Sequence, residues 1–201
     1  MKKLFILCLC AILFCCAILF LPTAHDRAIY DKTLRLHVLA DSDDEEDQAE
    51  KLAVRDEVLA LLEEEMTACD SKEDAKAVIL ENKERIQAAC EALLQTRGSE
   101  HSVKIELSEE YYPTREYEEI ALPAGKYLSL RVMIGQAEGK NWWCVLYPPV
   151  CLGACSAKQK LAGAGFDGEQ VKLVTEGSEV RYAVKFKVLE VIGRFWGKLF
   201  G

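Results

Sequence analysis

The sequence predicts an α+β protein with an N-terminal signal or anchor helix. One domain is expected to follow, with an antiparallel helix pair packed on a small mixed or antiparallel sheet, and a C-terminal helix. Three observations predict this class: an unbroken apolar run at the N-terminus, two long segments with helical apolar spacing, and short alternating segments between turn residues.

The N-terminal segment has the features of an export signal. Residues 4–21 form an apolar run behind the basic pair Lys2-Lys3. The length lies between a signal-peptide core and a short transmembrane helix, so we expect residues 1–24 to be a signal peptide or signal anchor. The rest of the chain is expected on the outer side, with membrane contact through this segment. A buried helix of a soluble protein is the alternative, but the run has no polar face.

The remainder, residues 25–201, is expected to form a single exported domain, since about 177 residues are enough for one core. Removing Lys2 and Lys3 from the 25 basic and 33 acidic side chains leaves 23 against 33, a net charge of −10. Such an acidic domain repels the phosphate backbone, so we expect no nucleic-acid partner.

Five cysteines lie outside the apolar run: Cys69, Cys90, Cys144, Cys151 and Cys155. An odd count in an exported protein leaves at least one thiol unpaired. Cys144 and Cys151 bracket a short proline-containing loop and are a possible disulfide pair, and Cys151 with Cys155 is the alternative. No histidine is near and no second pair has zinc spacing, so we expect no metal and no cofactor.

The most informative segment is a short apolar strand, residues 34–39, that leads into an amphipathic helix at about residues 44–67. Apolar side chains of this helix share one arc of a helical projection, and acidic side chains such as Glu50 lie opposite. The members of the arc are Leu52, Val54, Val58, Leu59, Leu62 and Met66. Five polar residues also project onto the arc: Asp44, Asp47, Gln48, Lys51 and Arg55. Charged groups that face an interior need partners.

Two interpretations of this polar patch are open. The first is an internal ion-pair network, in which Asp47 pairs with Lys51 four residues on and Arg55 follows one turn later. The second is a surface that contacts a partner, which residues of the preceding strand could join. The candidate partner-binding residues are then Arg35, His37, Asp41, Asp47, Lys51 and Arg55.

The remaining elements follow from spacing and turn residues. A second helix is expected from Asp70-Ser71 to about Gln95, ended by Gly98, and the short connection predicts an antiparallel pair. Strands are expected near residues 103–107, 115–120, 128–134 and 142–147. Residues 162–168 are expected to be a loop, and helical spacing from about Lys185 predicts the C-terminal helix.

Few residues are candidates for catalysis. Cys144 with His37 is a candidate thiol–imidazole pair, whereas His101 is expected in a loop and His25 beside the apolar run. The sequence contains no motif of serine hydrolases, zinc metalloproteases, nucleotide-binding loops or aspartic proteases. We therefore expect a non-enzymatic domain. An extracytoplasmic cysteine-dependent hydrolase and a structural envelope protein are the alternatives.

Three groups of residues carry a family resemblance. They are Arg35 to Asp43 with Asp47-Gln48, Lys51-Leu52 and Val54-Arg55-Asp56; Leu122 to Tyr127; and Asn141 to Cys151. In order and spacing they resemble the stage II sporulation protein R family of endospore-forming bacteria, over most of residues 30–155. At position 41 this chain has aspartate where the family has asparagine.

The resemblance implies a developmental signal. Members of the family are made in the forespore and exported into the intermembrane space of the sporulation septum, either secreted or anchored by the N-terminal segment. There they trigger a membrane-embedded aspartic protease of the mother cell, which processes the precursor of the first mother-cell sigma factor. The implied partner is this protease, and the catalytic aspartates belong to it.

Overall fold

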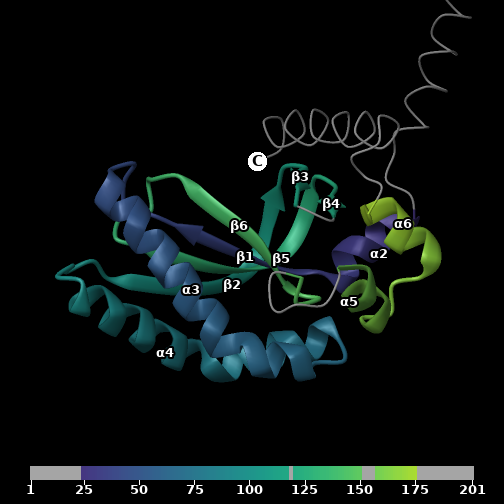
Figure 1. Cartoon of the computed structure of the whole chain (residues 1–201), viewed down its shortest axis with the longest axis horizontal. Coiled ribbons are helices and arrows are strands. Elements are labelled where there is room, and N and C mark those ends of the chain that lie inside the picture. The colour runs from purple at the N-terminus through teal and green to yellow at the C-terminus, as the bar shows by residue number, and fades with distance from the viewer. Residues whose placement is uncertain (1–23, 118–119, 151–156, 176–201) are drawn as a thin grey trace, which may run out of the picture.

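A computed structural model describes residues 24–117, 120–150 and 157–175, and within them it has the predicted α+β fold (Figure 1). The helices are α2 (Ala24–Lys32), α3 (Glu45–Ala68), α4 (Lys72–Thr96), α5 (Ala157–Gly163) and α6 (Gly168–Thr175). The strands are β1 (Leu34–Leu39), β2 (Val103–Tyr112), β3 (Arg115–Glu116), β4 (Ala121–Leu122), β5 (Gly125–Ile134) and β6 (Asn141–Tyr147). The predicted segment 1–24 and the predicted helix from Lys185 lie outside the described residues, apart from Ala24.

The main sheet is mixed, with four strands in the order β2-β5-β1-β6. β1 lies inside it and pairs parallel with β5 and antiparallel with β6, while β2 pairs antiparallel with β5. In this register Leu36 lies opposite both Leu130 and Cys144. β3 and β4 form a separate two-stranded hairpin. Strand β1 therefore reaches the centre of the sheet although it is first in the sequence.

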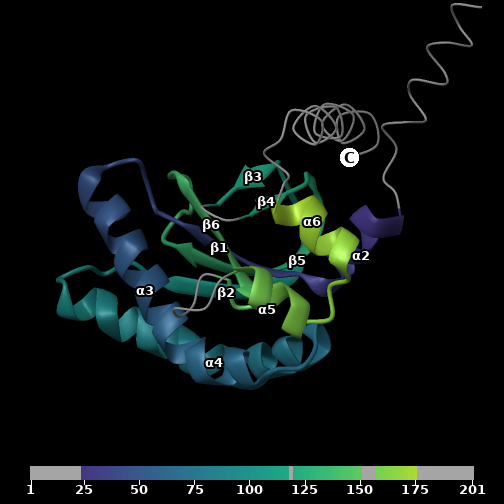
Figure 2. The same ribbon diagram turned by 45° about the vertical axis from the view of Figure 1, so that its right-hand side comes forward.

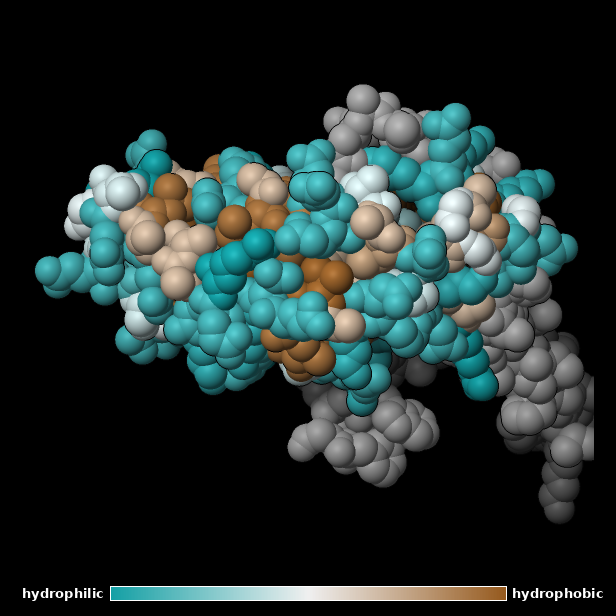
Figure 3. All heavy atoms as spheres, turned by 90° about the horizontal axis from the view of Figure 1, so that it is seen from below, coloured by the Kyte–Doolittle hydropathy of each residue, from teal (hydrophilic) through white to brown (hydrophobic). Residues whose placement is uncertain are grey.

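The predicted antiparallel helix pair covers one face of the sheet (Figures 1 and 2). Alternation in β1 directs Leu34, Leu36 and Val38 toward the helices, because successive side chains of a strand point to opposite faces. The buried side chains that meet them are Val54, Val58, Leu62 and Met66 of α3 and Ala75, Ile79, Ile86, Cys90 and Leu94 of α4. Burying each large aliphatic side chain contributes about 1.5–3 kcal/mol. The outer surface of this layer is mostly hydrophilic, with separate apolar areas (Figure 3).

The ends of α4 follow the sequence signals. The Ser71 hydroxyl accepts a hydrogen bond of 3.1 Å from the Asp74 amide, the geometry of an N-cap. At the other end Gly98 has a φ of +82°, which lets the chain leave the helix in the left-handed conformation. Both boundaries confirm the prediction.

The predicted buried arc of α3 is wrong at two positions of the first two turns. Lys51 is buried at 5% exposure, as the projection placed it, but Glu50 is also buried, at 4%, whereas Leu52 is 38% exposed. The physical reason is that these turns extend beyond the hydrophobic sheet: Lys51 binds the β5–β6 connection, and Glu50 binds His101. Polar partners, rather than apolar strands, therefore define the buried side of the helix here.

A second apolar cluster lies on the other side of the sheet. It contains Tyr112, Tyr127 and Val145 of the main sheet together with side chains of α2, β4, α5 and α6. The predicted loop at 162–168 is shorter than expected, because Gly163 still belongs to α5 and Gly168 begins α6. None of the helices that the structure describes is long and apolar enough to cross a membrane.

Candidate functional site

Asp41 follows β1 and is fixed by the connection between β5 and β6. Its Oδ1 accepts a hydrogen bond of 2.6 Å from the Gln136 amide, and its carbonyl accepts one of 3.0 Å from Glu138. Gly135 has a φ of +54°, and a Cβ added there would lie 1.9 Å from Asp41 Oδ1, so glycine is required. The bond to Gln136 needs an acceptor oxygen, which aspartate and asparagine both provide.

Three carboxylates surround His101, and we call these four residues the histidine–carboxylate cluster. His101 Nδ1 lies 3.0 Å from Glu50 Oε2 and 3.9 Å from Asp47 Oδ1, and His101 Nε2 lies 3.9 Å from Asp41 Oδ2. The hydrogen bond with Glu50 raises the pKa of His101, and the charges of Asp41 and Asp47 raise it further. The cluster therefore favours the protonated, positively charged imidazole.

The cluster also has ligand types that bind metal ions. Asp41, Asp47 and His101 each place one such atom within 4.8 Å of the others. A protonated His101 balances part of the negative charge in the same space without a metal ion. The bond between Glu50 and His101 Nδ1 is compatible with both arrangements, since a histidine that binds a metal through one nitrogen commonly donates its other N–H to a carboxylate.

Lys51 and Arg55 do not form the predicted network with Asp47. Lys51 Nζ donates to Gln48 Oε1 and, over 3.0 Å, to the Lys140 carbonyl. Burial lowers the pKa of Lys51, and the charge of Asp43 opposes that effect. Asp47 instead accepts from the Ser42 hydroxyl. The predicted ion-pair network is therefore wrong, because backbone and amide oxygens are nearer to the ammonium group.

Arg55 contacts an aromatic ring and a neighbour on its own helix. Its guanidinium carbon lies 4.4 Å from the centre of the Trp142 ring, and its Nη2 lies 2.7 Å from Asp56 Oδ1. The residue is half-buried at the edge of the helix layer. Of the three candidate residues on α3, Arg55 has the most exposed side chain, at 19% against 13% for Asp47, and Lys51 is buried.

Arg35 and His37 lie on the opposite face of the sheet from α3. His37 Nδ1 lies 2.8 and 2.9 Å from the two carboxylate oxygens of Glu110, and Nε2 lies 2.7 Å from Asn141 Oδ1. Both ring nitrogens are thus occupied, as in a structural histidine. The six predicted residues do not form one surface, because alternation along β1 directs Arg35 and His37 away from the helices.

Arg35 is fully buried among three tyrosines, which we call the tyrosine box. Its guanidinium carbon lies 4.0 Å from the ring centre of Tyr112, 5.0 Å from that of Tyr127 and 5.7 Å from that of Tyr117. Nη2 donates to the Tyr117 hydroxyl, whereas Nε and Nη1 have no hydrogen-bond partner. Sequence reasoning named Arg35 but found no sign of these rings, which are distant in sequence.

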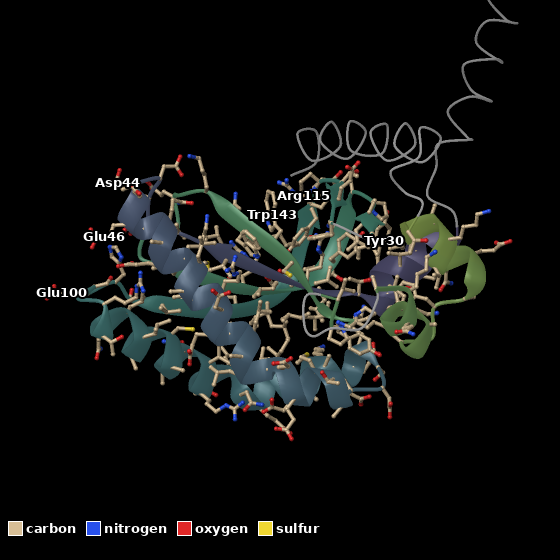
Figure 4. All side chains as sticks on the ribbon, viewed as in Figure 1. Tyr30, Asp44, Glu46, Glu100, Arg115 and Trp143 are labelled. Carbon is tan, nitrogen blue, oxygen red and sulfur yellow. The ribbon has the colours of Figure 1, made fainter. Side chains whose placement is uncertain are left out.

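Arg115 and Trp143 lie next to the tyrosine box. The Arg115 guanidinium carbon is 3.7 Å from the centre of the Trp143 ring, and Figure 4 shows the two side chains between β3 and β6. Their contact brings the two-residue strand β3 to the main sheet. The hairpin therefore covers the side of the sheet that carries Arg35.

The predicted thiol–imidazole pair of Cys144 and His37 is wrong. In β6, Cys144 lies opposite Leu36 and Trp143 lies opposite His37, so the sulfur and the imidazole are on opposite faces of the sheet. Cys144 is also disulfide-bonded, whereas Cys69 and Cys90 are free. Cys151, its predicted partner, lies outside the described residues. A disulfide sulfur is no thiolate, so it lacks the nucleophile that such a hydrolase needs.

Comparisons with known proteins agree on one family. The family described as Stage II sporulation protein R (spore_II_R) matches residues 30–157. A curated relative, stage II sporulation protein R of Bacillus subtilis (strain 168), is 33% identical over 123 residues, which are 61% of this chain and 55% of the relative. The match thus spans little more than half of that relative's length. No solved structure matches the chain. The chain belongs to the stage II sporulation protein R family.

Proposed function

We propose that this protein is an intercellular signal of sporulation. It is exported from the forespore by residues 1–24 and activates a membrane-embedded aspartic protease of the mother cell. That protease then processes the precursor of the first mother-cell sigma factor. The observation that carries the proposal is the family match over residues 30–157. This range contains the helix pair and every described strand.

The proposed mechanism is differential binding. An activator that performs no bond chemistry shifts its partner only if it binds the active arrangement more tightly than the inactive one. A preference of about tenfold is equivalent to about 1.4 kcal/mol. The disulfide at Cys144 supports this mechanism over a cysteine-dependent hydrolase, because it removes the candidate nucleophile.

The end of the molecule where α3 begins is the proposed contact surface. Asp41, Asp47 and Arg55 are only partly buried there, and the labelled side chains of Asp44 and Glu46 point outward at the same end (Figure 4). The other three candidates, Arg35, His37 and Lys51, are buried and are proposed to hold this scaffold in place rather than to touch the protease.

The test replaces Arg55 by glutamate, with Arg85→Glu as the matched control. Both residues are arginines that pair with a carboxylate on the helix pair: Arg55 with Asp56, and Arg85 with Glu65. Each full-length variant is co-expressed with the protease and the sigma-factor precursor, and its fold is checked by circular dichroism. We expect Arg55→Glu to reduce processing severalfold and Arg85→Glu to leave it unchanged. Equal processing by both variants would contradict the proposed surface.

A further inference from the structure

We propose that Arg35 forms a binding site for a carboxylate group, which enters at the position of the Tyr117 hydroxyl. The site lies on the sheet face opposite the helix pair, away from the surface proposed above. It requires neither the protease nor the proposed function, since the chemistry of the site alone selects the ligand. The ligand is either a free carboxylic acid or an acidic side chain of a protein.

The first observation is a buried cation without a counter-ion. Arg35 is 0% exposed, yet no carboxylate pairs with it among the described residues. The neighbouring carboxylate of Glu110 is occupied by His37 and by Arg131, whose Nε lies 3.5 Å away. Buried arginines are ordinarily paired with a carboxylate, because an isolated charge loses its hydration. The buried guanidinium of Arg35 would therefore be stabilised by a bound anion.

The second observation is that two of its nitrogens are unsatisfied. Nε and Nη1 are buried and have no hydrogen-bond partner. The rings of Tyr112 and Tyr127 attract the positive charge, but a ring face offers no oxygen lone pair to these N–H groups. Native proteins leave few buried donors unpaired, and each one calls for an explanation. A ligand with acceptor oxygens supplies the missing partners.

The Tyr117 hydroxyl occupies the place where such an oxygen would bind. It accepts from Nη2, and each edge of a guanidinium pairs Nη2 with either Nε or Nη1. A carboxylate that replaced this single hydroxyl would accept two parallel hydrogen bonds along one edge, the fork geometry that arginine favours. Tyr117 is only partly buried and follows the two-residue strand β3, so its side chain can turn outward while the main sheet stays in place.

The surroundings select a carboxylate over a more highly charged anion. Arg35 carries one positive charge, and the tyrosine box adds ring faces on which a flat group can lie. A planar, singly charged carboxylate matches both features. The tetrahedral, doubly charged phosphate would need further cations, and Arg115 beside the tyrosine box already stacks on Trp143.

The experiment observes the Arg35 Nε–Hε signal by NMR in the ¹⁵N-labelled full-length chain, assigned by through-bond correlation. The probes are sodium acetate and the peptide acetyl-Gly-Glu-Gly-amide. Sodium chloride at equal ionic strength and the peptide with glutamine in place of glutamate are the controls. We expect both carboxylates, and neither control, to shift the Arg35 signal in a saturable way.

Tyr117→Phe tests the position of the ligand. Removing the competing hydroxyl should tighten carboxylate binding about fivefold, the equivalent of one net hydrogen bond. Tyr111→Phe, on the opposite face of β2, should leave the affinity unchanged, and melting curves check that both variants are folded.

The outcomes separate the possibilities. Tighter binding of the glutamate peptide than of acetate identifies a protein-borne ligand, and equal binding identifies a free acid; either supports the site. The absence of a saturable shift with both carboxylates, or unchanged affinity in Tyr117→Phe, overturns the proposal. Because no protease is present, these results are independent of whether the protein activates one.

Discussion

Replacement of Gly139 by alanine tests how the β5–β6 connection holds the histidine–carboxylate cluster. A Cβ at Gly139 would lie 2.0 Å from the Ser42 carbonyl oxygen and 3.0 Å from Ala40 Cβ, so the segment after β1 must move. That movement breaks the bonds of Gly139 N to Ala40 O and Glu138 N to Asp41 O, each 3.0 Å long. At about 1 kcal/mol each, with residual strain, the loss is about 2–3 kcal/mol.

A loss of this size lowers the melting temperature of a chain of this length by about 5–10 °C. The assay is thermal unfolding of the full-length chain followed by circular dichroism. Gly163→Ala is the matched control, since an added Cβ there meets nothing within 4 Å, and it should be neutral or stabilise by up to about 1 kcal/mol. Indistinguishable melting curves for the two variants would refute the reasoning.

Three further predictions concern titration, reactivity and hydrogen bonding. Asp41→Asn should lower the pKa of His101, seen by NMR, because one neighbouring negative charge is lost while the acceptor oxygen for the turn remains. The pKa of His101 is raised in the folded state, so protonated His101 stabilises the fold fully below its unfolded-state pKa, and this contribution is lost as pH rises through its folded-state pKa. Between these two pKa values, the free energy of unfolding should fall more for the wild type than for Asp41→Asn. Burial raises the pKa of the Cys90 thiol to about 12, so iodoacetamide should label it, by mass spectrometry, only after unfolding. His37→Phe should lower the free energy of unfolding by about 1–3 kcal/mol in urea titration, because Glu110 and Asn141 each lose a hydrogen bond.

Each of these predictions has a contrary result. An unchanged His101 pKa in Asp41→Asn would mean that the neighbouring carboxylate does not act on the imidazole. Labelling of Cys90 at equal rates in buffer and in urea would contradict its burial. A His37→Phe chain as stable as the wild type would show that the contacts with Glu110 and Asn141 contribute nothing.

Much of the fold could be predicted because its signals are local. The boundaries of α4 follow from Ser71 at the N-cap and Gly98 after the last turn, and the strands β2 and β5 follow from alternation. Strand β6 follows from the hairpin-length connection that precedes it. These features depend on residues within a few positions of one another. They are therefore visible in the sequence before any tertiary contact is known.

The candidate site was less predictable because it is built from tertiary contacts. Glu50 and His101 are 51 residues apart, and only the packing of α3 beside the start of β2 brings them together. A helical projection placed Glu50 on the solvent side, since it assumes that the buried side is apolar throughout. The environment of Arg35 was hidden for the same reason, because its tyrosines come from β2, from β5 and from the residue after β3.

The claim that this protein acts as an exported signal is tested most directly by processing of the sigma-factor precursor. The protease and the precursor are expressed together in a host that lacks other sporulation proteins, with the full-length chain, with the chain lacking residues 1–24, or with neither. Our account predicts processed sigma factor only with the full-length chain. Equal processing in its absence, or none in its presence, would contradict the account.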